Sequence, residues 1–177
     1  MHTDDLCTAR QQPMTDNRSE FVPVCGYFYQ TCGKFPSRPA QRYNAALYHG
    51  DNNGRFTYAE MLERVENIAC GLLSMGLERQ ERVGLMSRSS PYWTQTDMAV
   101  ASCAAVSVTV YPTLSAGEVS HILGDSGCRY LFIDTNENLN RIVNSLGELP
   151  ALERIVVMDF GYRSGDGRTI GLWDLME

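Results

Sequence analysis

The segment VYPTLSAGEVSHILGDSG, at residues 110–127, carries the densest set of structural signals in this chain. It predicts the end of a β-strand, a turn at the proline, a helix and a glycine stop. Ser115 and Glu118 stand at the two positions of a capping box, in which each side chain accepts a hydrogen bond from the backbone amide of the other. Leu114 and Val119 have the spacing of the hydrophobic staple that accompanies such a cap. None of these residues forms a recognisable nucleophile, base or metal cluster, so we expect the segment to be structural.

Strands and helices are expected to alternate on both sides of this segment. The expected strands are 42–49, 82–87, 107–111, 129–134 and 154–159. The expected helices are 56–77, 91–106, one from Ser115 to Gly124 or Gly127, 136–147, and one that begins at Leu172. DNNG at 51–54 is typical of a turn, and GYRSGDGRTIG at 161–171 of a loop or hairpin. Such alternation predicts an α/β fold in which a parallel sheet is covered by layers of helices.

Two further helix starts are specified by short-range signals. Thr57 and Glu60 form a second capping box, with Phe56 and Met61 as its staple. Gly76 is expected to stop this helix, whose apolar residues recur at helical spacing: Met61, Val65, Ile68 and Leu72. Ser90 followed by Pro91 is a typical N-cap and first helical residue; the residues expected to be buried in that helix are Trp93, Met98, Val100 and Ala101.

Length and composition are those of an ordinary globular protein. The 177 residues correspond to one domain or part of a larger one, and 44% of them are hydrophobic, which is enough for a packed core. The net charge of −6 disfavours nucleic acid or an anionic membrane as a partner. Residues 1–20 are polar, lack a secretory signal and are expected to be flexible, and the apolar run 98–110 is too short to span a bilayer.

The cysteines and histidines do not form a metal or disulfide pattern. None of the six cysteines belongs to a C-x-x-C pair, and Cys70 and Cys103 fall in apolar helical patterns, where a free thiol acts as a small hydrophobe. The three histidines are scattered without metal-ligand spacing. We therefore predict a reduced cytoplasmic protein, with peripheral attachment to a membrane left open.

Known nucleotide and hydrolase motifs are missing from the sequence. No strand is followed by G-x-G-x-x-G, and neither the P-loop G-x-x-x-x-G-K-[ST] nor G-x-S-x-G occurs. A phosphorylatable receiver-like domain would need a carboxylate at a strand end, acidic partners and a lysine. Asp134 does end an expected strand, but the strand 82–87 ends in Ser87-Arg88, and the only lysine, Lys34, is far from any such strand. His121 is a lone helical histidine. The sequence thus predicts no catalytic, cofactor-binding or metal-binding residue.

Four segments together resemble the adenylate-forming, or AMP-binding, superfamily of acyl-CoA synthetases. They are, in chain order, KFPSRPAQRY (34–43), TYAEM (57–61), RVGLMSRSSPYWTQTDMAVASCAAVSVTVYPTLS (82–115) and YPTLSAGEVSHILGDSGCRYLFI (111–133). The Tyr-Pro-Thr-Leu-Ser turn with its Ile-Leu and Asp-Ser-Gly helix is more similar to long-chain fatty acid ligases than to peptide-synthetase domains. Two positions depart from the pattern: Ala104 stands where the family often has Gly, and Thr109 where it often has Pro.

The resemblance implies a ligase that converts a carboxylic acid and ATP to an acyl-adenylate, then transfers the acyl group to coenzyme A, with Mg²⁺ on the phosphates. It implies that residues 21–177 are the N-terminal α/β subdomain of that fold, truncated before the phosphate-binding loop. ATP, Mg²⁺ and coenzyme A would then serve the full-length parent, and this fragment would be inactive and bind none of them.

Two alternatives stay open from the sequence. One is an amino-acid or aryl-acid adenylating domain, and the other is a self-contained, non-catalytic α/β binding or scaffold domain. The final apolar run LWDLME (172–177) favours a truncated ligase, with Trp173 and Leu175 exposed as contacts for missing structure. Homodimerisation through that exposed surface is the corresponding expectation.

Overall fold

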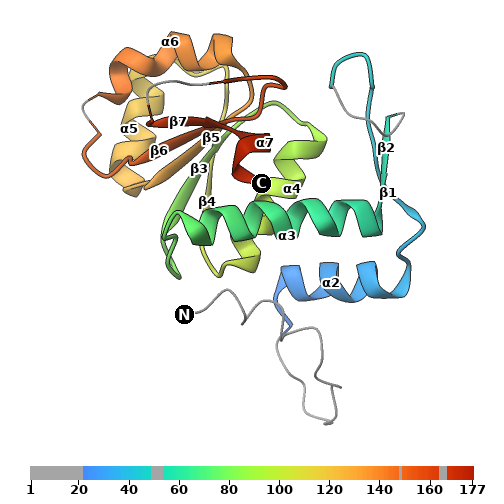
Figure 1. The fold of residues 1–177 in the computed structure, drawn as a ribbon. Helices are drawn as coiled ribbons and strands as arrows, with labels where there is room; N and C mark the ends of the chain where they lie inside the picture. The colour runs from blue at the N-terminus through green and yellow to red at the C-terminus, as the bar shows by residue number, and fades with distance from the viewer. Residues whose placement is uncertain (1–21, 49–53, 148, 164–166) are drawn as a thin grey trace.

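The structure is a computed structural model that describes residues 22–48, 54–147, 149–163 and 167–177. The expected flexible segment 1–20 and most of the expected turn 51–54 lie outside the described residues. Figure 1 shows a central sheet between layers of helices, with a small two-stranded ribbon at one side.

The central sheet has five parallel strands, as the alternating pattern predicts. Their order is β4-β3-β5-β6-β7, and every neighbouring pair is parallel. The strands are β3 (Arg82–Met86), β4 (Val106–Val110), β5 (Tyr130–Ile133), β6 (Arg154–Val157) and β7 (Thr169–Gly171). The α/β fold with a parallel sheet is therefore confirmed.

Helices cover both faces of this sheet (Figure 1). One face packs against α5 (Ala116–Ser126) and α6 (Asn136–Leu146). The other packs against α3 (Tyr58–Ser74), α4 (Pro91–Ser102) and the short α7 (Leu172–Leu175). A further helix, α2 (Val24–Lys34), packs against the outer side of α3.

Strand β5 shows why both faces must be covered. Tyr130 and Phe132 point into the core beneath α3 and α4, and Leu131 and Ile133 into the core beneath α5 and α6. All four side chains are fully buried. Because successive strand residues point to opposite faces, an apolar run of this kind requires two helical layers.

Both predicted capping boxes are present. The Glu60 backbone N–H donates to Thr57 Oγ1 at 3.3 Å, and the Thr57 N–H donates to Glu60 Oε2 at 2.7 Å. In α5 the corresponding distances are 3.4 Å, from Glu118 N to Ser115 Oγ, and 2.8 Å, from Ser115 N to Glu118 Oε2. The helix α5 ends at Gly127, which has the left-handed conformation (φ 62°) that glycine adopts readily.

The expected strand 42–49 is wrong. The strand is β1 (Pro39–Arg42), which pairs antiparallel with β2 (Arg55–Thr57). Asn44 then begins a turn, because its side chain accepts the Ala46 N–H at 3.0 Å and its carbonyl accepts the Leu47 N–H at 3.0 Å. Asn competes in this way with strand pairing, a local preference that outweighs the apolar character of the stretch.

The expected helix 91–106 begins correctly but ends early. The Trp93 N–H donates to Ser90 Oγ at 3.1 Å and Pro91 is the first helical residue, as predicted. The helix stops at Ser102 because Ala104 takes a left-handed conformation. Its buried face also differs from the expected one: Val100 is buried, whereas Trp93, Met98 and Ala101 are only half-buried. The buried positions include two polar residues, Gln95 and Thr96.

The C-terminal part corrects two expectations. The stretch 161–171 is not a hairpin, since its last residues form β7, parallel to β6. Leu175 is buried, and Trp173 is half-buried against Tyr92 and Phe160 at ring-centroid distances of 5.4 Å and 5.1 Å. The expected exposure of these two side chains is therefore wrong. A Cβ atom on Gly71 of α3 would lie 2.6 Å from Leu175 Cγ, so a glycine is needed for α7 to approach α3.

The helix α2 was not expected from the sequence. Its N-cap, Pro23, offers no side-chain hydrogen bond, and Cys32 is its only fully buried residue among those described. Without a capping residue or a broad apolar stripe, the local sequence resembles an irregular segment. Packing against α3 is what stabilises such a helix.

Candidate functional site: the carboxyl edge of the sheet

The strand order defines a preferred ligand-binding position. From β3 the chain moves outward to β4, then crosses to β5 on the other side of β3, so the direction of winding reverses between β3 and β5. In open α/β sheets, ligands bind outside the carboxyl ends of the strands at such a reversal. Here those ends lead into Ser87-Arg88 and Asp134-Thr135.

Asp134 holds the two strand ends together. Its Oδ2 accepts the Arg88 backbone N–H at 3.1 Å and lies 3.5 Å from Arg88 Nε. Its Oδ1 accepts a hydrogen bond of 2.7 Å from Asn138 Nδ2. The Asp134 side chain is only 10% exposed, whereas that of Arg88 is 71% exposed. The carboxylate is thus occupied by neighbours, and the guanidinium remains accessible to a ligand.

This geometry brings together the residues that were compared with a receiver-like site. Ser87-Arg88 and Asp134 follow the neighbouring strands β3 and β5 and do meet. The only lysine of the sequence, Lys34, lies at the end of helix α2 and belongs to neither strand end. Both carboxylate oxygens of Asp134 already accept hydrogen bonds. The contacts between Asp134 and Arg88 therefore hold the ends of β5 and β3 together.

A cleft of about 70 Å³ lies at these strand ends. It is lined by Leu47, Tyr48, Ser87, Arg88, Ser90, Tyr92, Asp134, Thr135, Met158, Asp159 and Phe160. Sites for small organic ligands usually enclose about 300–1,000 Å³. The cleft therefore provides one wall of a nucleotide-sized site and cannot enclose a nucleotide.

The hydroxyl groups at this cleft have structural partners. Ser90 Oγ and Thr135 Oγ1 each accept a backbone N–H, both at 3.1 Å, and so cap α4 and α6. Ser87 Oγ donates to the Arg88 carbonyl at 2.6 Å, and the Tyr48 hydroxyl donates to the Ser89 carbonyl at 3.0 Å. None of these four hydroxyl groups is positioned as an activated nucleophile.

Charges of both signs meet at this edge. The helices α4 and α6 both begin here, and helix N-termini carry a partial positive charge. The exposed guanidinium of Arg88 adds a positive charge, but the Asp134 carboxylate lies 3.5 Å from its Nε, and Asp159, whose Oδ2 accepts the Asn136 N–H at 3.4 Å, also lines the cleft. The helix N-termini and Arg88 are thus partly offset by these two carboxylates.

A second cleft of about 250 Å³ continues the edge toward β4. It is lined by Ser87, Ser89, Trp93, Thr109, Val110 and Tyr111. The following turn is fixed from α6, because Arg141 donates to the carbonyls of Leu114 and Pro112, both at 2.5 Å. The segment 110–127 therefore shapes this edge without supplying a reactive group.

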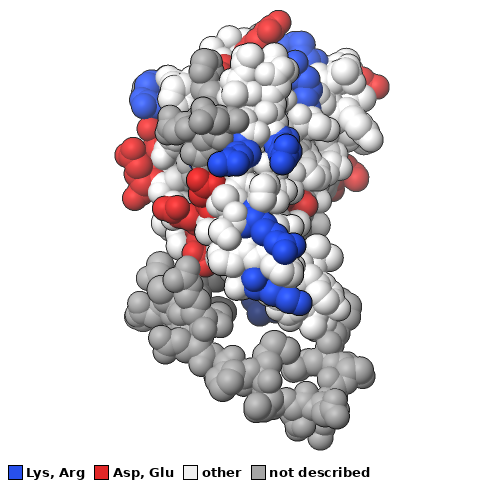
Figure 2. All heavy atoms as spheres, turned by 90° about the vertical axis from the view of Figure 1, so that its right-hand side faces the viewer, with Lys and Arg blue, Asp and Glu red and all other residues white. Residues whose placement is uncertain are grey.

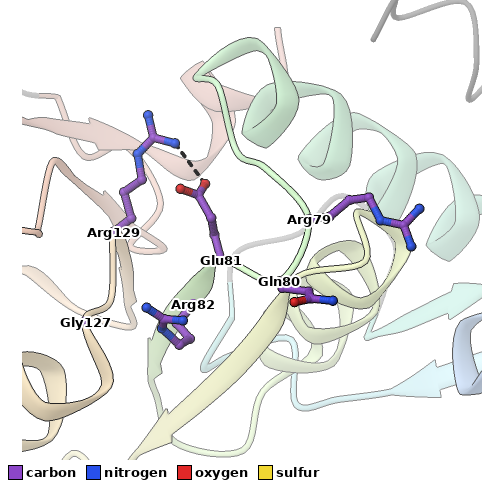
Figure 3. Close-up of a pocket in the computed structure, with 6 residues that line it drawn as sticks. All are labelled: Arg79, Gln80, Glu81, Arg82, Gly127 and Arg129. Carbon is purple, nitrogen blue, oxygen red and sulfur yellow. Dashed lines mark hydrogen bonds and ion pairs between the residues drawn. The ribbon is translucent and has the colours of Figure 1, made fainter.

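The opposite edge of the sheet carries a cleft that is structural. Figure 3 shows Arg129 and Glu81 facing each other there, and Arg79 pointing away from that pair. Arg129 bonds to Glu81 Oε2 and Glu153 Oε1, both at 2.8 Å, and to the Gly76 carbonyl at 2.6 Å. These bonds raise the pKa of Arg129, with Glu153 as the largest cause. The two carboxylates thus neutralise the guanidinium of Arg129, which serves as a structural tie between them.

The described residues contain no other obvious chemistry. No group of three or more His, Cys, Asp or Glu among them could hold a metal ion. His121 is exposed on α5. Burial raises the pKa of the Cys103 thiol to about 12, which makes it unreactive. Nor does the described part of the chain include a helix long and apolar enough to cross a bilayer.

With this fold and edge in place, the class of the protein is a doubly wound α/β domain with a binding position at its carboxyl edge. The family model for the AMP-binding enzymes matches residues 28–168. The chain therefore belongs to that family, as the four sequence segments indicated.

Curated relatives agree with this assignment. A long-chain-fatty-acid–CoA ligase of Drosophila melanogaster, heimdall, is 28% identical over 141 residues, covering 78% of this chain and 21% of the relative. The long-chain-fatty-acid–CoA ligase FadD15 of Mycobacterium bovis is 32% identical over 100 residues, covering 56% of this chain and 17% of that protein. The mitochondrial medium-chain acyl-CoA ligase ACSF2 of Bos taurus is 29% identical, with 75% and 24% covered. The chain spans about a fifth of the length of these relatives.

Solved structures show the same fold. The anthranilate CoA ligase AuaEII, in complex with anthranoyl-AMP, superposes with a TM-score of 0.77 at 21% identity, covering 88% of this chain and 28% of that one. The long-chain-fatty-acid–CoA ligase FadD1 of Archaeoglobus fulgidus gives a TM-score of 0.75 at 19% identity, covering 94% and 32%. The chain thus has the fold of the N-terminal part of an adenylate-forming ligase.

Proposed function

We propose that this chain is the front part of an ATP-dependent acyl-CoA synthetase that activates a long-chain fatty acid as its adenylate and transfers it to coenzyme A. The observation that carries the proposal is the family match over residues 28–168. The names of the Drosophila and Mycobacterium relatives support a long-chain acid, whereas the Bos taurus relative supports a medium-chain one. Residues 21–177 would form one subdomain of the parent, with the phosphate-binding loop further along.

The described residues do not by themselves fit ATP or Mg²⁺. The cleft at the switch point encloses about 70 Å³, and no described carboxylate cluster could hold a cation. No catalytic step is therefore assigned to this chain. Its part would be to form a rigid wall of the site, to which the exposed Arg88 and the first turns of α4 and α6 contribute. We infer that the 177-residue chain alone is inactive.

The test compares two proteins in the same assay. The full-length parent is expected to exchange radiolabelled pyrophosphate into ATP when palmitate is added, and to form palmitoyl-CoA when coenzyme A is also present. The 177-residue chain is expected to do neither. A panel of octanoate, laurate, palmitate, benzoate and amino acids distinguishes the long-chain hypothesis from the hypotheses of a medium-chain, aryl-acid or amino-acid substrate.

Each alternative has its own outcome in this assay. A full-length protein that exchanges pyrophosphate only with benzoate or an amino acid would move the assignment to an aryl-acid or amino-acid adenylating enzyme. Absence of exchange with every acid, in a protein shown to be folded by circular dichroism, would favour a non-catalytic binding or scaffold domain. Calorimetry with ATP, Mg²⁺ and coenzyme A on the 177-residue chain checks its inactivity separately.

A cytoplasmic location belongs to the same proposal. The described cysteines are all free thiols, which supports a reducing compartment: Cys25, Cys32, Cys70, Cys103 and Cys128. Fractionation of cells that express the full-length protein tests this location.

A further inference from the structure

The charge of the chain is unevenly distributed. Residues 22–57 contain four basic residues and one acidic residue, Asp51, although the whole chain has a net charge of −6. The four are Lys34, Arg38, Arg42 and Arg55, and they are called the basic face below. They come from the end of α2, the connection to β1, and the strands β1 and β2.

The basic face is exposed and only lightly neutralised. All four side chains are exposed, and none of them forms a close ion pair within the described part of the chain, although Glu60 lies near enough to Arg55 for their charges to attract. Arg42 and Arg55 are direct neighbours across the β1–β2 pair. Figure 2 looks onto this side of the molecule and shows several basic side chains along its middle, with most of the acidic side chains to the left and a few at the top and the right.

Two residues of the basic face, Lys34 and Arg38, contact the ring of Phe35. The Lys34 ammonium lies 5.2 Å from the centre of its ring and the Arg38 guanidinium 4.7 Å. Cation–π contacts of this kind hold two like charges close together beside an apolar ring. The ring therefore holds Lys34 and Arg38 near each other without a close ion pair to a described residue.

Apolar side chains accompany these charges on α2. Val24 is 71% exposed and Tyr27 is 60% exposed. Together with Lys34 they occupy one side of the helix, because positions i, i+3 and i+10 nearly align along an α-helix. Val24 and Tyr27 lie about 10 to 15 Å from Lys34 along the helix axis, at a rise of 1.5 Å per residue. Exposed apolar and aromatic residues that share one side of a helix with a basic residue are typical of helices that lie at a membrane interface.

The surroundings of the basic face indicate which kind of partner it would bind. None of its four residues lines the clefts found among the described residues, which disfavours a small-molecule site there. The ring of Phe35 is already engaged by two cations, which disfavours the base stacking used in single-stranded nucleic acid recognition. An extended anionic surface with an apolar interior fits both the charges and the exposed Val24 and Tyr27.

We propose that the basic face, together with Val24 and Tyr27, docks the protein on an anionic lipid bilayer. The net charge of −6 conceals this property, because the opposing charges lie elsewhere in the sequence. The proposal rests on the basic face with Val24 and Tyr27 alone and does not depend on the catalytic assignment of the parent.

The test is sedimentation of the 177-residue chain with vesicles. We expect binding to vesicles that contain phosphatidylcholine and phosphatidylserine, weak binding to pure phosphatidylcholine, and release at high salt, which screens surface charges. The variant Arg38→Gln/Arg42→Gln/Arg55→Gln should bind the anionic vesicles on the order of 100-fold more weakly. The variant Val24→Ser/Tyr27→Ser should weaken binding to the anionic vesicles at low salt, because it removes the apolar contribution and leaves the charges in place.

A matched control is Arg79→Gln/Arg82→Gln/Arg154→Gln. It changes the net charge by the same amount, and its three arginines are exposed near the opposite, amino edge of the sheet. This control should bind vesicles as the unmodified chain does, with both variants checked for folding by circular dichroism. Equal loss in the control, or equal binding to neutral and anionic vesicles by the unmodified chain, would overturn the proposal. Stronger binding to an RNA oligonucleotide than to vesicles, lost in the first variant, would replace the membrane by nucleic acid.

Discussion

At the scale of single residues, two backbone positions are strained. Gln80 (φ 64°) and Ala104 (φ 55°) are the two described non-glycine residues with positive φ. They face each other, since the Gln80 N–H donates to the Ala104 carbonyl at 2.8 Å. The left-handed conformation of Ala104 ends α4 and directs the chain into β4. The family's frequent Gly at position 104 now has a physical reason, because glycine adopts this conformation without steric cost.

The substitution Ala104→Gly should therefore stabilise the protein. Relief of the left-handed strain is expected to raise the free energy of unfolding by about 1 kcal/mol, measured by urea denaturation. Ala101→Gly, in the helical part of α4, is the matched control and should lower it by about 1 kcal/mol. If both glycines were destabilising, the strain at position 104 would not be a real cost.

Thr109, the other departure from the family pattern, has a simpler explanation. It lies in β4, which pairs only with β3 among the described strands. A proline is tolerated in such an edge strand, whereas a threonine suits a strand equally well by β-propensity. The exchange therefore leaves the architecture unchanged.

At the scale of elements, the sequence was most informative where short-range chemistry decides. Both capping boxes, the Ser90-Pro91 helix start and the Gly127 stop are confirmed at the expected residues. The failures were elements whose position depends on distant partners. The helix α2 is held by α3, and β7 by β6, so neither has a strong local signal.

The Thr57–Glu60 box should make stability depend on acid pH. The hydrogen bonds that Glu60 accepts from the backbone and side chain of Thr57 lower the pKa of its carboxyl group. A lowered folded-state pKa gives stability that is present above the ordinary value of about 4.5 and is lost as pH falls through the folded-state pKa. Thr57→Ala should therefore cost about 1 kcal/mol at neutral pH, and this difference should shrink below about pH 4.5.

Chemical denaturation of both proteins between neutral and acid pH measures this effect. Thr94→Ala is a suitable control, because Thr94 lies within α4 away from any capping position. Its effect on the free energy of unfolding should be the same at each pH. A Thr57→Ala difference that stays constant into acid would mean that Glu60 ionisation does not contribute to the box.

At the scale of the whole molecule, the sequence predicted the fold class and the family but not the candidate site. The order β4-β3-β5-β6-β7 arises from pairing between strands that are far apart in the chain, and no local pattern specifies it. The sequence predicts that strands end at Asp134 and at Ser87-Arg88. Only the pairing of β3 with β5 shows that these two strand ends meet. The same long-range packing buries Leu175, which looked exposed when α7 was considered alone.

Exposed apolar residues at the carboxyl edge lead to a final prediction about association. Leu47 is 70% exposed and Tyr111 is 76% exposed, and each lines one of the two clefts there. Because apolar side chains that border a cleft tend to be covered by a partner, we expect the 177-residue chain to self-associate through this edge, in place of the surface first expected at Trp173 and Leu175.

Light scattering should show an apparent mass that rises with concentration, and Leu47→Ser/Tyr111→Ser should abolish that rise. Val106→Ser/Val143→Ser, at exposed valines on β4 and α6, removes apolar surface elsewhere and should leave the rise intact. A chain that stays monomeric at every concentration would show that this edge does not pair with a second copy, and the exposed residues would then be contacts for the rest of a longer ligase alone.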